Sequence, residues 1–225
     1  MRLLALDASS RQGEAALVSW DAGRTSLVAE FSEELGNTHS SRLLPMVEAL
    51  LAGAGWPKSS LDGYAAIRGP GSFTGIRVAL GLVSGLAMAA SRPCVGVGTL
   101  PAMAEAYGPA PVARVPLLDA GRGEVYGARF DAAGSPPAAE CEAWVGDARL
   151  ALAPGGPIVV FGSGASAYEA RLREAGFTGE IGSAPRSLAA AAGRIALAWL
   201  AAGAVPPGDL APLYIRPTDA ELKFR

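Results

Sequence analysis

The sequence predicts an α/β fold built from two related halves, each with a mixed β-sheet. Three short apolar runs separated by turn residues precede an alternation of helical and strand patterns, and much of this order returns in the second part of the chain. The segments "LLALDASSRQGEAALV" and "VPLLDAGRGEVYGARF" share an apolar strand, Leu-Asp-Ala, a polar turn and Gly-Glu, which makes Asp7 and Asp119 counterparts. Such an order of elements is typical of mixed sheets flanked by helices.

The first half is expected to span residues 1–106. Its strands are predicted at residues 3–9, 13–20, 25–33, 61–67 and 93–98. A helix over residues 39–52 is predicted to take Asn37 or Thr38 as its N-cap, and Pro45 fits that helix only if it starts close by. A second helix over 75–90 and a short one near 100–108 complete this half.

The second half is expected to span residues 107–225. A pair of strands within 115–130 is followed by a strand over 156–164, a helix over 166–176 and an Ala-rich helix over 187–203. Duplicated halves with an aspartate at the first hairpin are similar, by analogy, to the actin-like (ASKHA) fold, in which both halves are ribonuclease-H-like.

Composition narrows the class of protein. The chain has 225 residues, of which 50% are hydrophobic and 18% charged, so it can bury a large core and has apolar surface left for a partner. The formal net charge is −2 and the lysines are Lys58 and Lys223, which argues against nucleic-acid binding by this chain alone. Cys94 and Cys141 form no disulfide framework, and neither a signal peptide nor an apolar run of spanning length is expected. These features indicate a reduced, cytoplasmic protein without a membrane span.

The loop "GPGSFTGIR", residues 69–77, invites comparison with phosphate-binding loops. It has no lysine, so it is not a Walker loop, and Gly69, Gly71 and Gly75 give the spacing G-x-G-x-x-x-G rather than that of the dinucleotide motif. An anion could still bind at the helix N-terminus with help from Arg77. The favoured interpretation is that the glycines let the backbone pass close to a neighbour and that Ser72 or Thr74 caps the helix.

A nucleotide site remains a hypothesis at this stage. Asp7 and Asp119 would hold a metal-bound phosphate if the halves face each other across a cleft, although each aspartate could equally organise its own turn. The turn at Gly162 and Gly164 is a place where adenosine could rest. The candidate residues of this hypothesis are Asp7, Gly69, Gly71, Gly75, Gly162 and Gly164.

The helix after the loop points to a partner. From Val78 to Ala90 it carries no charge, and its interior contains Gly81 and Gly85, each costing about 1 kcal/mol relative to alanine. A helix enclosed within the domain would explain this, but the helix over 39–52 also has more apolar positions than one core-facing stripe needs. We therefore expect both helices to form a bundle between two subunits. The predicted interface residues are His39, Arg42, Leu43, Met46, Arg77, Val78, Gly81, Ser84, Gly85 and Met88.

Catalytic machinery is not evident. His39 is the only histidine, which excludes a multi-histidine metal site, and no nucleophile with a base and an orienting third group can be assembled. We expect neither catalytic nor metal-binding residues. An alternative is a small actin-like ATP-dependent kinase or hydrolase that acts alone, and a peptidase is a third, less favoured interpretation.

The segments "LALDAS", "THSSRLLPMVEALL", "LDGYAAIRGPGSFTGIRVALGLVSGLA", "GVGTL", "LLDAGRGEVYGARF" and "PLYIRPTDAE" together resemble the TsaB (YeaZ) family, nearly from end to end. The resemblance implies a non-catalytic subunit that dimerises with the catalytic paralogue TsaD. The complex transfers a threonylcarbamoyl group to the adenosine next to the tRNA anticodon.

The resemblance also implies further partners. A TsaE-type ATPase joins the complex, the subunit alone forms homodimers through a similar surface, and tRNA is contacted only through the complex. The resemblance also implies that this subunit has no cofactor of its own, and that ATP or ADP, if bound, would lie at the junction with partner subunits. TsaD carries two metal-binding histidines after the strand that corresponds to "CVGVG"; the matching residues here, Thr99 and Met103, cannot bind such a metal.

Overall fold

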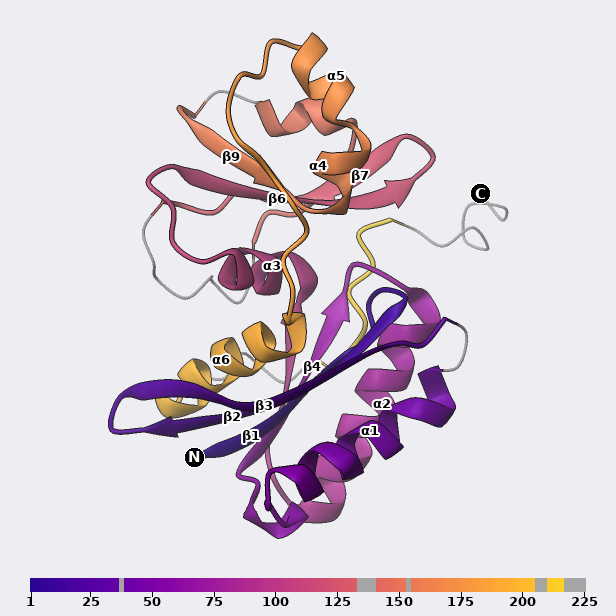
Figure 1. Cartoon of the computed structure of the whole chain (residues 1–225), viewed down its shortest axis with the longest axis vertical. Coiled ribbons are helices and arrows are strands. Elements are labelled where there is room, and N and C mark those ends of the chain that lie inside the picture. The colour runs from indigo at the N-terminus through magenta and orange to yellow at the C-terminus, as the bar shows by residue number, and fades with distance from the viewer. Residues whose placement is uncertain (37–38, 133–140, 153–154, 205–209, 217–225) are drawn as a thin grey trace.

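The computed structural model describes residues 1–36, 39–132, 141–152, 155–204 and 210–216, with the side chains of His39 and Ser40 excepted. Two layered halves lie one above the other in Figure 1. Each half contains one five-stranded sheet, so the predicted α/β fold with mixed sheets is confirmed.

The sheet of the first half has the strand order β3-β2-β1-β4-β5. Its strands are β1 (Arg2–Asp7), β2 (Gln12–Asp21), β3 (Arg24–Glu34), β4 (Gly63–Gly69) and β5 (Cys94–Gly98). The first three strands form an antiparallel meander, whereas β4 and β5 run parallel to β1. All five strands lie where the sequence predicts them.

The sheet of the second half repeats this topology. Its strands are β6 (Ala113–Gly121), β7 (Glu124–Gly127), β8 (Trp144–Gly146), β9 (Ile158–Phe161) and β10 (Ile181–Gly182), in the order β10-β9-β6-β7-β8. Here β6, β7 and β8 pair antiparallel, and β9 and β10 run parallel to β6. Listed from the other edge, this order is β8-β7-β6-β9-β10, in which β6 takes the place of β1 in the first sheet. The shared topology confirms the internal repeat.

Helices cover both faces of the first sheet. Helices α1 (His39–Gly53) and α2 (Phe73–Ala90) pack on one face, and α6 (Leu188–Ala201) packs on the other, as Figure 1 shows. Strand β1 serves both layers because its side chains alternate: Leu4 and Leu6 contact α1 and α2, whereas Leu3 and Ala5 face α6. The expected caps Asn37 and Thr38 lie outside the described residues. Pro45 lies well inside α1 with its side chain exposed, so the expectation that the helix starts close to it is wrong.

Two helices join the halves. Helix α3 (Thr99–Tyr107) lies between them, because Leu100 and Met103 pack with Phe130 and Phe161 of the second half and Ala102 packs with the core of the first. Helix α6 follows the second sheet and packs on the first. Arg194 of α6 bonds to Glu105 of α3 at 2.9 Å. The boundary at 106/107 stays a prediction, but α6 departs from the expectation that residues 107–225 pack as one half.

Two other helical predictions need correction. The helix expected over 166–176 is divided at Tyr168 into α4 (Ser163–Ala167) and α5 (Glu169–Glu174), and short 3-10 turns occur at Lys58–Ser60 and Ala148–Leu152. In the described part of the chain, α2 is long and apolar enough by composition to cross a membrane, although no run of that length was expected. This is weak evidence for a span, because core helices of soluble proteins pass the same test and α2 packs against β4.

The close packing of α6 on the first sheet depends on Gly193. A Cβ atom at this position would lie 2.6 Å from Cγ2 of Val18 and 3.3 Å from Cβ of Ala5. We predict that Gly193→Ala lowers the free energy of unfolding by about 1–3 kcal/mol, because overpacking outweighs the gain in helix propensity. Gly81→Ala is the matched control: nothing lies within 4 Å of its Cβ position, so it should raise stability by about 0.5–1 kcal/mol. Urea denaturation of both variants measures the difference, and equal effects would contradict the assignment.

Candidate functional site

In the glycine loop between β4 and α2, backbone atoms of other segments occupy the space beside the glycines. The Cβ positions of Gly69 and Gly71 lie 2.6 Å and 2.3 Å from the carbonyl oxygens of Leu213 and Ser9. The backbone N–H of Ser72 donates to the carbonyl of Ser9 at 2.6 Å. The interpretation as a close backbone approach is therefore confirmed, because carbonyl oxygens crowd the loop.

The N-cap of α2 is one of the two residues that the sequence predicted, Ser72 or Thr74. The hydroxyl of Ser72 accepts a hydrogen bond from the backbone N–H of Gly75 at 3.3 Å, so Ser72 rather than Thr74 is the N-cap. Gly75 itself is buried in the first turn of the helix.

The turn after β9 shows the same close packing. The Cβ position of Gly162 lies 2.5 Å from the carbonyl oxygen of Leu117, and that of Gly164 lies 2.7 Å from the Cγ1 methyl group of Val125. The glycines thus let the turn pack directly on β6 and β7. The two glycine sets of the nucleotide hypothesis have different neighbours: Gly69 and Gly71 contact Leu213 and Ser9, whereas Gly162 and Gly164 contact Leu117 and Val125.

Asp7 and Asp119 organise equivalent turns. The Oδ1 atom of Asp7 accepts from the backbone N–H of Ser9 at 2.7 Å, and that of Asp119 accepts from Gly121 at 2.9 Å. In both cases the carboxylate holds the backbone two residues further on, as aspartates commonly do in turns. Asp119 also accepts from the Tyr168 hydroxyl at 3.0 Å. The turn-organising interpretation accounts for both residues.

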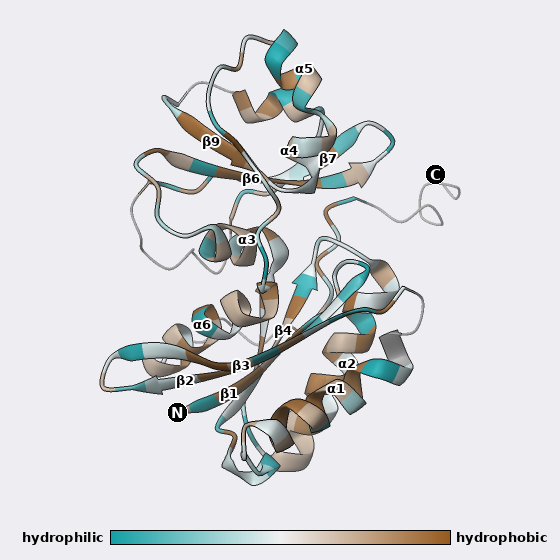
Figure 2. Cartoon of the chain, viewed as in Figure 1, coloured by the Kyte–Doolittle hydropathy of each residue, from teal (hydrophilic) through white to brown (hydrophobic). Residues whose placement is uncertain are grey.

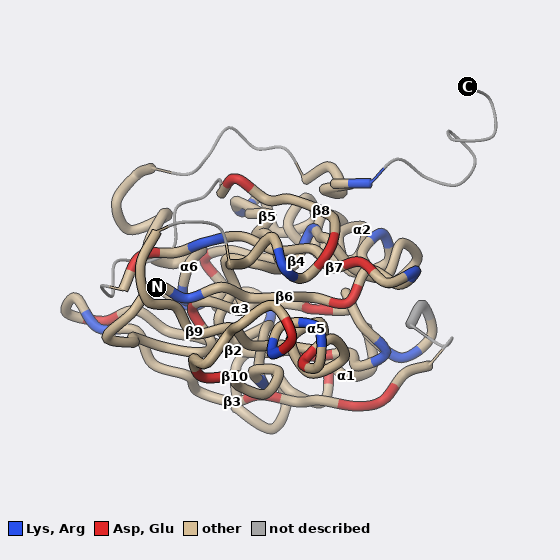
Figure 3. Tube along the Cα trace, turned by 90° about the horizontal axis from the view of Figure 1, so that it is seen from above, with Lys and Arg blue, Asp and Glu red and all other residues tan. Residues whose placement is uncertain are grey.

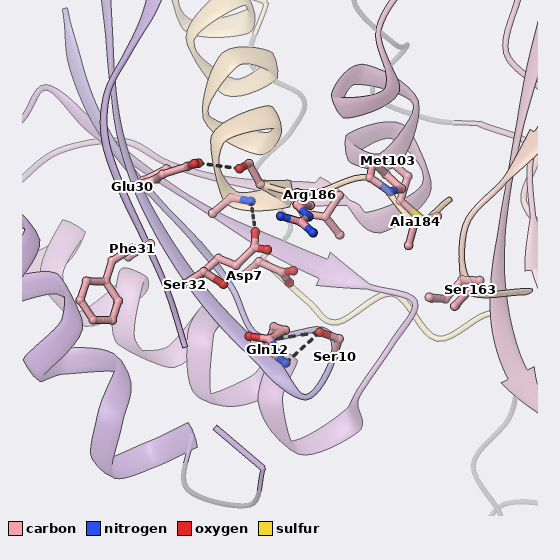
Figure 4. Close-up of a pocket in the computed structure, with 18 residues that line it drawn as sticks. Asp7, Ser10, Gln12, Glu30, Phe31, Ser32, Met103, Ser163, Ala184 and Arg186 are labelled. Atoms are coloured by element: carbon pink, nitrogen blue, oxygen red, sulfur yellow. Dashed lines mark hydrogen bonds between the residues drawn. The ribbon is translucent and has the colours of Figure 1, made fainter. Parts of the chain in front are cut away.

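A pocket of about 620 Å³ opens between the halves. Figure 4 shows its wall of first-sheet residues, with Met103 and Ser163 on the opposite side and Arg186 next to the first turn of α6. Glu14 accepts from the backbone N–H of Ala189 at 3.0 Å and so occupies the N-terminus of α6. The described lining of the pocket includes Asp7 but not Asp119.

The charge of this pocket is unfavourable for phosphate. The carboxyl groups of Asp7, Glu14 and Glu30 line it, against a single guanidinium, that of Arg186, among the described lining residues. Glu30 accepts from the Ser187 hydroxyl at 2.5 Å, so a second carboxylate also serves the start of α6. The N-terminus of α6 is therefore satisfied by the protein's own acidic side chains.

Asp7 titrates far from its ordinary range. Burial, followed by the negative charge of Glu14, raises the pKa of Asp7 from 3.8 to about 7. Burial likewise raises the pKa of Glu14. Because the folded state holds the Asp7 proton more tightly than the unfolded chain does, this group makes stability fall as the pH rises from about 4 to about 7.

We predict that Asp7→Asn reduces this pH dependence and is more stable than the wild-type protein at pH 8. The amide oxygen of the introduced asparagine would keep the bond from Ser9 while removing a buried charge. Urea denaturation at pH 5 and pH 8 measures the effect. Asp119→Asn makes the same chemical change at the equivalent but exposed turn residue and is the matched control. If Asp119→Asn gains as much stability over the wild-type protein at pH 8 as Asp7→Asn does, the prediction is contradicted.

The outer face of α2 is uncovered. Gly81 and Gly85 are exposed with nothing within 4 Å of their Cβ positions, so neither glycine is explained by packing inside the described chain. Met88 is 80% exposed on the same side, and Ser84 lies between them, partly buried. Val78 is partly buried against the core. Figure 2 shows how far apolar residues dominate α2 and its neighbour α1.

Helix α1 contributes fewer residues to the outer surface than the predicted interface requires. Leu43 and Met46 are 0% and 3% exposed and belong to the core beneath the helix, so their assignment to an outer interface is wrong. The buried residues of α1 form a single stripe, and Leu44 is an exposed large apolar side chain outside it. Arg42 is exposed and forms an ion pair with Glu33. The side chain of His39 lies outside the description.

The sequence analysis missed two aromatic residues, one at the start of α2 and one in the segment beside it. Phe73 and Tyr214 are 44% and 40% exposed and stack with ring centroids 5.4 Å apart. The Nε atom of Arg77 donates to the Tyr214 hydroxyl at 2.8 Å, and its guanidinium lies 3.8 Å from the Phe73 ring centroid. Sequence spacing offers a signal only for Phe73, four residues before Arg77 on the helix; Tyr214 is far away in the chain.

Metal-binding clusters and basic patches offer no other site in the part that the structure describes. No group of three or more His, Cys, Asp or Glu residues there could hold a metal ion. Figure 3 shows blue Lys and Arg segments scattered among red ones along the trace. The α2 face is thus the strongest candidate site.

Comparisons with known proteins decide the family. The family model described as "TsaD: tRNA N6-adenosine threonylcarbamoyltransferase" matches residues 31–171, which is more than half of the chain. The Escherichia coli protein named tRNA threonylcarbamoyladenosine biosynthesis protein TsaB is 39% identical over 132 residues, or 58% of this chain. The chain belongs to this family, and within it the chain is similar to proteins named TsaB and YeaZ. The match covers 55% of the Escherichia coli protein, so it spans about half the length of that relative.

Solved structures agree with this family assignment. YeaZ from Pseudomonas aeruginosa is 28% identical with a TM-score of 0.71, and the match covers 95% of this chain and 99% of that one. Component A of the (R)-2-hydroxyglutaryl-CoA dehydratase from Acidaminococcus fermentans is 12% identical with a TM-score of 0.50, covering 86% of this chain and 96% of that one. This second likeness shows the fold alone, and together the two support the predicted actin-like architecture.

Proposed function

We propose that this TsaB/YeaZ-type protein is a non-catalytic subunit that dimerises with the TsaD-type catalytic paralogue. The complex would transfer a threonylcarbamoyl group to the adenosine next to the tRNA anticodon. The names of its relatives support this role, since they join tRNA threonylcarbamoyladenosine biosynthesis with the TsaD family. The observation that carries the proposal is the uncovered α2 face, with Gly81 and Gly85 open to an approaching backbone.

The chemistry of this face suits a helix of a related subunit. Exposed glycines cost helix stability, and such a cost is tolerated where another backbone must come close. A paralogue with the same fold would present an equivalent helix, so two related faces could meet around a pseudo-twofold axis. The same geometry would let two copies of this chain form a homodimer in the absence of the paralogue.

A charged substitution on the face tests the proposal. Gly81→Arg should abolish or weaken association with the TsaD-type subunit by at least about tenfold, because a long charged side chain would be buried where backbones meet. The substituted Cβ has free space in the isolated chain, so the fold should be retained. Isothermal titration calorimetry and the threonylcarbamoyl transfer activity of the reconstituted complex provide the measurements.

The matched control is Ala170→Arg, which places the same side chain on exposed helix α5 of the second half. It should bind the paralogue as the wild-type chain does. If Gly81→Arg retains wild-type affinity and activity, the α2 face is not the docking surface and the proposed role loses its support.

We also propose that the chain holds no nucleotide by itself. Carbonyl groups crowd its glycine turns, and Glu14 occupies the α6 N-terminus. Calorimetry of the isolated protein with Mg-ATP should detect no micromolar binding, whereas binding with turnover would favour a kinase or hydrolase that acts alone.

Under this proposal, any ATP or ADP lies at the junction with the partner subunits, which we propose include a TsaE-type ATPase. Location in the cytoplasm and contact with tRNA only through the complex complete this proposal.

A further inference from the structure

The C-terminal segment 210–216 crosses from the first half to the second beside the α2 face. Figure 1 shows it in yellow between the halves. Leu210 packs against the core beneath α1 and α2, and the backbone N–H of Leu213 donates to the carbonyl of Arg68 at 2.6 Å. Further on, Ile215 packs against the cluster that contains Phe130 and Phe161. The segment is thus anchored in the cores of both halves.

Arg216 fixes the far end of this segment to the first hairpin of the second half. Its Nη1 atom donates to the carbonyl of Ala120 at 3.1 Å, and its Nη2 atom pairs with the carboxylate of Glu124. Its guanidinium also lies 5.9 Å from the ring centroid of Tyr126. Tyr214, two residues earlier, is therefore held between an anchor on β4 and an anchor on β7.

Between these anchors, Tyr214 completes a rigid cluster at the start of α2. Its ring stacks on Phe73, and its hydroxyl accepts from Arg77, whose guanidinium also covers the Phe73 ring. All three side chains are exposed. Exposed aromatic and arginine side chains that are already immobilised lose little further freedom on association, and these residue types dominate interface energies.

The cluster continues the uncovered α2 face. Phe73, Arg77, Gly81 and Gly85 are spaced by four residues, so each is a neighbour of the next along the helix surface. Arg77 is the only charge on α2. Its terminal nitrogens have no acceptor among the described residues, which leaves donors directed at whatever covers the face.

We infer that the segment 210–216 is part of the docking surface, with Tyr214 as an aromatic anchor that Arg216 positions from the second half. The occupant is the paralogous subunit of the proposed function, on which this inference rests. Its side of the contact should be an apolar, small-residue helix face with a carboxylate or carbonyl oxygen opposite Arg77. Docking would then contact α2 and a segment tied to the second half at once.

Binding of purified TsaD-type subunit to Tyr214 variants tests the inference. Tyr214→Ala should weaken the affinity about tenfold, and Tyr214→Phe less, because it keeps the stacking on Phe73 and loses only the bond from Arg77. Tyr168→Ala is the matched control: this tyrosine also bonds through its hydroxyl to its own chain but lies in the second half, away from α2. It should bind as the wild-type protein does. Phe73→Ala gives a second measurement should Tyr214→Ala be poorly folded by circular dichroism.

A double-mutant cycle tests the positioning role of Arg216. Arg216→Ala should weaken binding and make the segment more susceptible to limited proteolysis, and Tyr214→Ala with Arg216→Ala should bind no more weakly than Tyr214→Ala. Additive losses would overturn the positioning role. If Tyr214→Ala and Phe73→Ala bind normally while Gly81→Arg does not, this inference fails and the proposed function stands. If Gly81→Arg also binds normally, the proposed function itself fails.

Discussion

The packing of α3 and α6 between the halves is the constraint on which the rest of the structure depends. Helix α3 packs in the cores of both halves, α6 crosses to the first sheet, and the bond between Arg194 and Glu105 joins the two helices. Gly193 lets α6 lie directly on Val18 and Ala5, because it has no side chain. These contacts join the two halves. They thereby fix the pocket between the halves and the path of the segment 210–216.

Glycine serves two opposite purposes in this chain. At Gly69, Gly71, Gly162 and Gly164 the space that a side chain would need is already filled, mostly by backbone carbonyl groups, so these glycines are explained by internal packing. At Gly81 and Gly85 that space is empty. Only the second kind has no explanation within the described chain, although an exposed helical glycine is unfavourable for the isolated chain. This contrast supports both the interpretation of the 69–77 loop as a structural turn and the proposal that α2 contributes to an interface.

The pocket between the halves has a structural role. Its carboxylates cap α6 and bond to Ser187 at the start of that helix. Asp7, the residue that the nucleotide hypothesis placed at a phosphate, is 1% exposed and holds the N–H of Ser9. The acidic residues that line this pocket thus hold the start of α6 and the turn at Ser9.

The sequence by itself determined the first-half strands, the repeat that pairs Asp7 with Asp119, and the charge-free stretch 78–90 with its glycines, but it did not indicate the short edge strands β8 and β10. The features that it did determine are local patterns, and period, turn residues and charge report them directly. The tertiary structure alone decided that Leu43 and Met46 face the chain's own core, because apolar spacing shows that a residue is buried but not against what. It also decided that α6 crosses to the first sheet and that Tyr214 reaches Phe73 and Arg77. These contacts join residues more than a hundred positions apart, and no local pattern encodes such a distance.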